Sequence, residues 1–198
     1  MQSPEIIRER LAEVQARVGE GVTVVAATKY VSLPDMAALL EAGVTVVGEN
    51  RAQDLEAKHA AHGAAFRWHF IGHLQSRKAK LVSEICELVH SLDSASAAQR
   101  LTIPALVQVN LAGEETKSGV PPDRLAELLE LYADVRGLAT MPPFAEDPEE
   151  SRPYFRKLRE LAEEHGLAEL SMGTSQDYRV AAQEGATMIR IGSVLYQG

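Results

Sequence analysis

The sequence holds a single cysteine, Cys86, among 198 residues, and this scarcity excludes an internal disulfide framework. Cys86 has Ile85, Leu88 and Val89 nearby in the sequence, so we predict that it packs in the core and is not a nucleophile. No apolar run approaches the ~18 residues of a membrane span. A chain of this kind fits a reducing compartment, and we expect a cytoplasmic protein.

Positive charge is also scarce. Lys and Arg together number 20 against 28 Asp and Glu, which gives a net charge of -8 and a pI of about 5.3. This balance argues against general binding to nucleic acid or to an anionic membrane. The length allows one well-packed core, and no change of composition marks a linker. We therefore predict one domain over residues 1–198, and we expect a monomer.

Strand-like and helix-like segments alternate after an amphipathic helix predicted at 3–18. The predicted strands are 22–28, 45–49, 66–72, 88–92, 105–110, 137–141, 169–172 and 187–192; the predicted helices between them include 34–42, 51–61, 77–85, 123–134, 148–165 and 176–184. Such alternation produces parallel strands joined by helical crossovers. An open doubly wound sheet would normally carry a glycine-rich turn after its first strand, and ATKYVSLP has no glycine. The sequence therefore favours a (β/α)8 TIM barrel with an extra N-terminal helix.

Lys29 follows the first predicted strand, VTVVAAT, at the end where α/β folds place their chemistry. A buried lysine there loses part of its basicity and becomes a nucleophile for carbonyl groups. The alternatives are a lysine that extends to the rim and one that holds a phosphate as a point charge.

The last two predicted strands end in MGTSQD and IRIGSV. Loops after strands seven and eight form the usual phosphate site of a barrel, so we expect Ser175, Gly192 and Ser193 to hold a phosphate. Asn50 and Asn110 are the only two asparagines, and both stand at the ends of predicted strands, as turn formers or as ligand contacts. Arg190 shares a face with Gly192 and either approaches a ligand ring or fills the barrel interior.

A carbonyl-reactive lysine beside a phosphate site describes an aldolase-type enzyme or a pyridoxal-phosphate protein. His69 and His73 are four residues apart, but an extended strand does not bring such a pair together as a helix does. We therefore predict no metal site.

The motifs ATKYV, VVGENRAQD, WHFIGHLQSRK, VNLAGEETKSG, GLATM, SMGTSQD and MIRIGS occur in order between residues 22 and 194. Together they resemble the YggS/PROSC family of pyridoxal-phosphate homeostasis proteins. The resemblance implies a barrel like the N-terminal domain of alanine racemase, with pyridoxal 5'-phosphate held as a Schiff base on Lys29. The resemblance implies that Asn50 lies near the ring and that Arg190 lies at the pyridine nitrogen. It implies a phosphate site formed by Ser175, Gly192 and Ser193, and it adds Met172 to the cofactor-binding residues. The chain departs from the usual motifs at Val31, Thr174 and Ser193.

An arginine at the ring nitrogen does not leave the pyridine protonated, so the ring is a weaker electron sink than it is beside a carboxylate. The chain ends six residues after Gly192, where the related racemases continue into a domain that supplies a second base. We therefore expect a cofactor carrier, with apo enzymes that use pyridoxal phosphate as its partners, and not an efficient enzyme. A weak amino-acid racemase and a Schiff-base aldolase acting on a phosphorylated sugar remain the alternatives. We also expect the loop 114–119, through Lys117, to govern release of the cofactor.

Overall fold

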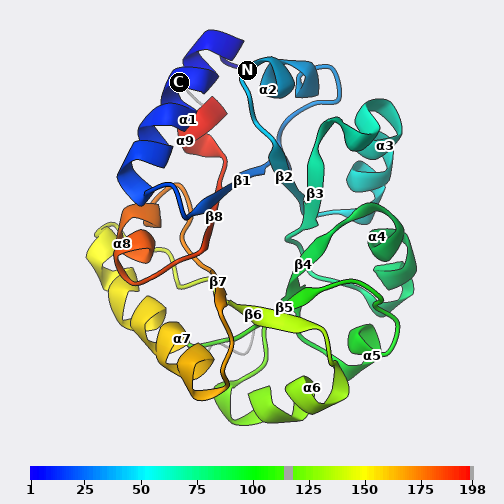
Figure 1. The fold of residues 1–198 in the computed structure, drawn as a ribbon, viewed down its shortest axis with the longest axis vertical. Helices are drawn as coiled ribbons and strands as arrows, with labels where there is room; N and C mark the ends of the chain where they lie inside the picture. The colour runs from blue at the N-terminus through cyan, green and yellow to red at the C-terminus, as the bar shows by residue number, and fades with distance from the viewer. Residues whose placement is uncertain (114–117, 197–198) are drawn as a thin grey trace.

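The computed structural model describes residues 1–113 and 118–196, and its strands close into one parallel barrel (Figure 1). The strands run in chain order around the barrel, and β1 closes the ring by pairing with β8 through Val25 and Arg190. The strands are β1 Thr23–Ala27, β2 Val46–Glu49, β3 Arg67–Phe70, β4 Leu88–Leu92, β5 Ala105–Gln108, β6 Val135–Ala139, β7 Glu169–Ser171 and β8 Met188–Ile191. The predicted barrel is thus confirmed, and the open-sheet alternative is wrong.

Helices surround the barrel, and the N-terminal helix lies outside the ring beside α8 and α9 (Figure 1). The α-helices are α1 Pro4–Val18, α2 Met36–Glu41, α3 Ala52–His62, α4 Ala79–Ile85, α5 Ala95–Ala98, α6 Leu125–Leu131, α7 Arg152–Glu164, α8 Tyr178–Gln183 and α9 Ser193–Tyr196. Short 3-10 turns occupy Gly63–Ala65, Ser76–Lys78, Pro122–Arg124 and Pro148–Ser151. Ser3 caps α1 by accepting a hydrogen bond from the backbone of Ile6, and Pro4 occupies its first turn, as SPE predicts.

The core has two layers because strand side chains alternate between the helices and the barrel interior. The large layer lies between strands and helices and includes Trp68, Phe70, Phe155, Leu158 and Cys86. Burial raises the pKa of the Cys86 thiol to about 12, which fits the predicted packing role. The smaller apolar cluster consists of Leu88, Leu106, Ala139 and Met188. Polar side chains, among them His69, His90, Ser171 and Arg190, take further inward positions.

Element boundaries differ most from the prediction where helices begin. The predicted helix at 34–42 begins only at Met36, so Pro34 lies before its first turn. Ser76 begins a 3-10 turn and does not cap α4, which starts at Ala79. Ser175 does not cap α8; its hydroxyl faces the following strand instead.

The segment 114–117 lies outside the described residues, so the predicted role of Lys117 in cofactor release remains a prediction. Among the helices that the structure does describe, none has the length and apolar character needed to cross a bilayer.

Candidate functional site

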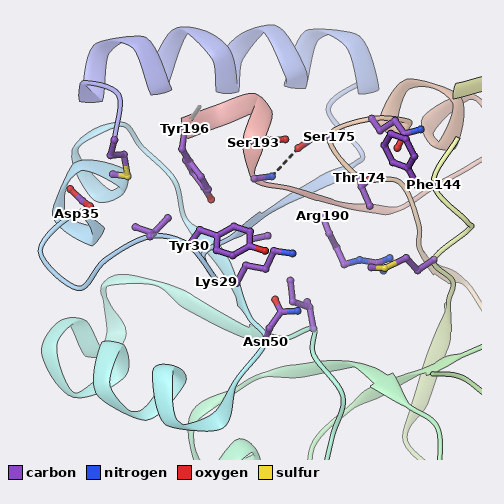
Figure 2. A pocket seen from close by; sticks show the side chains of 17 residues that line it. Lys29, Tyr30, Asp35, Asn50, Phe144, Thr174, Ser175, Arg190, Ser193 and Tyr196 are labelled. Atoms are coloured by element: carbon purple, nitrogen blue, oxygen red, sulfur yellow. Dashed lines mark hydrogen bonds between the residues drawn. The ribbon is translucent and has the colours of Figure 1, made fainter. Parts of the chain in front are cut away.

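A cavity of about 590 Å³ opens at the carboxyl ends of the strands (Figure 2). Its volume falls within the range of small-molecule sites. Six of the seven predicted site residues line it: Lys29, Asn50, Ser175, Arg190, Gly192 and Ser193. Its rim is apolar, because Tyr30, Met141 and Phe144 expose 80%, 52% and 83% of their surface around the opening. The chain therefore gathers an amine, hydroxyl groups and a guanidinium in one cavity.

Lys29 stands two residues after the last residue of β1, and its side chain points into the cavity (Figure 2). Its Nζ lies 4.7 Å from the centre of the Tyr30 ring. Lys29 is exposed, so the burial assumed from the sequence is wrong for this lysine. The amine is instead open to a ligand that enters the mouth of the barrel.

A buried ion pair supports the backbone directly before this lysine. The ammonium of Lys58, on α3, contacts Glu49 Oε1 and donates to the carbonyl of Thr28 at 2.7 Å. Thr28 Oγ1 donates to Glu49 Oε1 at 2.6 Å, and the backbone N–H of Asn50 donates to Glu49 Oε2 at 3.1 Å. The pair therefore ties the residue before Lys29 to the backbone of Asn50.

Gly72 allows the chain after β3 to lie against Asn50. A Cβ atom added at Gly72 would lie 2.0 Å from the carbonyl oxygen of Asn50, which is far inside contact distance. Only glycine is compatible with this approach. The GEN and FIG sequences thus meet directly beneath the cavity.

The loops after β7 and β8 meet through Ser175. Its Oγ accepts hydrogen bonds from the backbone N–H groups of Gly192 at 3.1 Å and Val194 at 3.3 Å (Figure 2). Because the oxygen acts as an acceptor in both bonds, the hydroxyl hydrogen is left to donate. Ser193 is exposed at the start of α9. This side of the cavity presents hydroxyl groups to an anion, whereas Thr174 uses its own hydroxyl to bind Asp177 at 3.0 Å.

Arg190, on β8, is buried and extends along the cavity wall (Figure 2). Its Nη1 donates to the carbonyl of Ser171 at 2.9 Å and to Ser171 Oγ at 2.5 Å, and its Nη2 donates to the carbonyl of Thr140 at 2.8 Å. Burial lowers the pKa of Arg190 to about 10, so the guanidinium remains charged at neutral pH. It fills the barrel interior and also lines the cavity, and its approach to a ligand ring stays a prediction.

Four of the residues singled out from the sequence do not join the site. Met172 is fully buried in the outer core and is absent from the cavity wall. Asn110 accepts a hydrogen bond from the backbone of Gly113 within its own loop. His69 points into the barrel, whereas His73 pairs with Asp93 at 3.5 Å. Among residues 1–113 and 118–196, no group of three or more metal-binding side chains was found.

Sequence reasoning missed two residues of the site. Tyr196, which was not among the predicted site residues, lines the cavity with a buried hydroxyl. Lys58 was not considered, although its spacing from Ala52 and Leu55 places it on the buried face of α3. A lysine on an otherwise apolar face was the available signal.

The parallel barrel and the cavity at its mouth define a class of α/β-barrel domains. The family model "Alanine racemase, N-terminal domain" matches residues 3–198. PipY of Synechococcus elongatus PCC7942, whose structure was solved with PLP bound, is 32% identical, with a TM-score of 0.84 over 96% of this chain and 99% of that chain. A lysine/ornithine decarboxylase of Vibrio vulnificus shares the fold alone, at 14% identity and a TM-score of 0.72 over 98% of this chain and 62% of that chain.

Two relatives that are similar over nearly the whole chain identify one family within this class. The pyridoxal phosphate homeostasis protein of Aquifex aeolicus is 40% identical over 214 residues, covering 96% of this chain and 94% of the relative. That of Deinococcus radiodurans is 39% identical over 201 residues, covering 94% and 95%. The chain belongs to the family of pyridoxal phosphate homeostasis proteins, as its motifs predicted.

Proposed function

We propose that this protein binds pyridoxal 5'-phosphate as a Schiff base on Lys29 and takes part in intracellular pyridoxal phosphate homeostasis without efficient catalysis of its own. The observation that carries the proposal is the convergence of Lys29, Ser175 and Arg190 on one cavity. The amine condenses with the aldehyde of the cofactor and releases water. The PLP-bound structure of PipY, a relative with the same fold, supports the choice of ligand.

The residues present fit this cofactor. Asn50 Oδ1 and the Tyr196 hydroxyl are buried beside the cavity without a hydrogen-bond partner in the described part of the chain. An unpartnered buried polar atom costs free energy, so such atoms indicate a polar ligand. A phosphate accepts hydrogen bonds from the Ser175 and Ser193 hydroxyls and from the backbone near Gly192, while the largely apolar remainder of the wall suits a planar ring.

The cavity is better suited to holding the cofactor than to transforming amino acids on it. Pyridoxal phosphate supplies an electron-withdrawing ring, which is most effective when the ring nitrogen is protonated. Arg190 faces the cavity as a charged donor and has no carboxylate to offer that nitrogen. Burial raises the pKa of Tyr196, so its phenol stays protonated and is a poor base for a racemase. A carrier role follows from both properties.

Three further expectations belong to the same proposal. We propose that residues 1–198 form one pyridoxal-phosphate-binding domain, that the protein acts as a monomer in the cytoplasm, and that apo enzymes receive its cofactor. Gel filtration of the loaded protein tests the second, and reactivation of an apo enzyme by the loaded protein tests the third.

Borohydride reduction followed by peptide mapping tests the Schiff base. Incubation with pyridoxal phosphate should produce a yellow protein, and reduction should fix the cofactor to the peptide that contains Lys29. Lys29→Ala should lose the visible band and the label. Lys80→Ala is the matched control, because Lys80 is 88% exposed on α4, outside the cavity. A label on another lysine would refute the assignment.

The same sample separates the alternatives. A Schiff-base aldolase would remain colourless with pyridoxal phosphate and would be labelled at Lys29 only with a phosphorylated sugar. A racemase would exchange the Cα hydrogen of alanine for deuterium. The proposal expects the yellow colour together with exchange no faster than that of free pyridoxal phosphate.

A further inference from the structure

A continuous, largely buried chain of hydrogen bonds crosses the barrel interior from Arg190 to the opposite mouth. Ser171 Oγ lies 2.7 Å from His90 Nδ1, and His90 Nε2 lies 2.8 Å from His69 Nδ1. His69 Nε2 lies 2.9 Å from Glu87 Oε1, which also contacts Arg67 at 2.6 Å. Both histidines are buried, whereas the side chains of Glu87 and Arg67 are 40% and 62% exposed.

The carboxylate of Glu87 decides the direction of every bond in this chain. Burial raises the pKa of Glu87, but hydrogen bonds from Arg67 and His69 outweigh this and hold it below its ordinary value, so Glu87 is ionised and only accepts. His69 therefore carries its hydrogen on Nε2. Burial lowers the pKa of both histidines, of His90 most strongly, so both rings are neutral and each has one N–H.

The remaining bonds follow by elimination. His69 Nδ1 has no hydrogen and accepts from His90 Nε2, which leaves His90 Nδ1 as an acceptor. The hydroxyl of Ser171 then donates to His90, and its oxygen accepts from Arg190 Nη1. Donors and acceptors match at each of the four contacts, and both histidines are Nε2–H tautomers.

This chain links the guanidinium of Arg190 through hydrogen bonds to a carboxylate that it does not touch directly. The hydrogen-bond acceptors of its guanidinium are neutral: the carbonyls of Ser171 and Thr140 and the hydroxyl of Ser171. The aligned N–H and O–H dipoles turn their negative ends toward Arg190 and place the charge of Glu87 at the far end of the chain. The same alignment fixes which lone pair of Ser171 the guanidinium contacts.

We propose that Glu87, His69 and His90 are positioning residues that act through Ser171 to hold Arg190 against the ring nitrogen of the bound heteroaromatic ligand. The proposal rests on the proposed function, because the ring nitrogen belongs to pyridoxal phosphate. Since Arg190 only donates, the ligand must present an unprotonated nitrogen acceptor. A ring that has a carbon at this position gains nothing from the chain.

Measuring the affinity for two ligands distinguishes a positioning role of these residues from general damage to the fold. Pyridoxal phosphate is compared with its 1-deaza analogue, in which C–H replaces the ring nitrogen. A hydrogen bond to a charged donor changes affinity by roughly 10–100-fold, and the native protein should show a preference of this order for pyridoxal phosphate. His90→Leu and Ser171→Ala should each reduce that preference several-fold, and Arg190→Leu should abolish it. His90→Gln should restore part of it, because the amide offers one acceptor and one donor.

Ser91→Ala is the matched control for Ser171→Ala. Ser91 is a buried serine next to His90, but its hydroxyl donates to the carbonyl of Gly72 and takes no part in the chain. It should leave the preference unchanged. Equal losses of both ligands in the His90 and Ser171 variants would assign the chain a purely structural role and overturn the proposal.

The second measurement needs no cofactor. Long-range ¹H–¹⁵N spectra of the ligand-free protein at pH 7 should show His69 and His90 as neutral Nε2–H tautomers, and Glu87→Leu should mix the tautomers of both. A native Nδ1–H tautomer at either ring would overturn the inference. If the native protein bound neither ligand while the tautomers were as expected, the proposed function would fail and the chain would lose its role toward the cofactor.

Discussion

Replacing Lys58 by methionine tests whether the buried ion pair supports the site. The side chains of Lys58 and Glu49 are only 7% and 0% exposed. Removing the ammonium leaves the carboxylate of Glu49 buried with two hydrogen-bond donors but no counter-ion. Loss of one partner of a buried pair costs about 3–5 kcal/mol, which corresponds to a fall in Tm of roughly 6–20 °C for a chain of this size.

Urea denaturation followed by circular dichroism measures this loss. Lys80→Met is the matched control, because Lys80 pairs with Glu84 on an exposed helix surface; it should cost less than about 0.5 kcal/mol. The double variant Glu49→Gln, Lys58→Met should recover most of the loss, since no buried charge remains. A cost below about 1 kcal/mol for Lys58→Met would show that water reaches the carboxylate, and the reasoning from burial would be wrong.

Two further changes have defined outcomes. Ser175→Ala should weaken binding of pyridoxal phosphate by roughly 10–100-fold while hardly changing that of pyridoxal, which lacks the phosphate; equal effects in equilibrium titrations would exclude a phosphate contact. His69 and His90 have folded-state pKa values below their unfolded value of about 6.5, so the unfolded chain binds more protons in acid. Their contribution to stability is complete above that value and is lost as the pH falls below it, by up to about 1.4 kcal/mol per pH unit for each histidine. His90→Leu should reduce this slope in urea denaturation between pH 6.5 and 5, and an unchanged slope would show that His90 is not neutral in the fold.

The barrel was predictable because each strand is a short apolar run followed by a helix with one apolar face. The exact ends of the strands and helices could not be predicted from the sequence. The predicted strand at 137–141 is Val135–Ala139 in the structure, because β6 pairs through Val135 with Ala105 before the apolar run begins. Pairing with a neighbour that is 30 residues distant in sequence decides such boundaries, and local composition does not report it.

The site was predictable where a residue follows a strand, as Lys29, Asn50 and Gly192 do. Topology brings such positions together whatever the side chains between them are. Lys58 and Tyr196 lie on helices, and their role depends on which face the helix turns to the barrel. His90 was not singled out because a histidine inside a strand has no local partner in sequence.

The polar groups inside this barrel are buried either because they stabilise the fold or because they fix the positions of residues at the cavity. An apolar side chain at His90 or Lys58 would avoid the cost of burying polar groups, and buried ion pairs are often no better for stability than hydrophobic replacements. The two polar networks nevertheless end at or next to residues that line the cavity. The Glu49–Lys58 pair ends at the backbones of Thr28, which precedes Lys29, and Asn50, and the histidine chain ends at Arg190. Directional bonds restrict a backbone or a guanidinium to one place, which apolar packing does not do for a charged group. If these networks are buried in order to fix positions, replacing the interacting polar side chains of one network by apolar ones should keep or raise Tm. The same replacements should lower the affinity for pyridoxal phosphate.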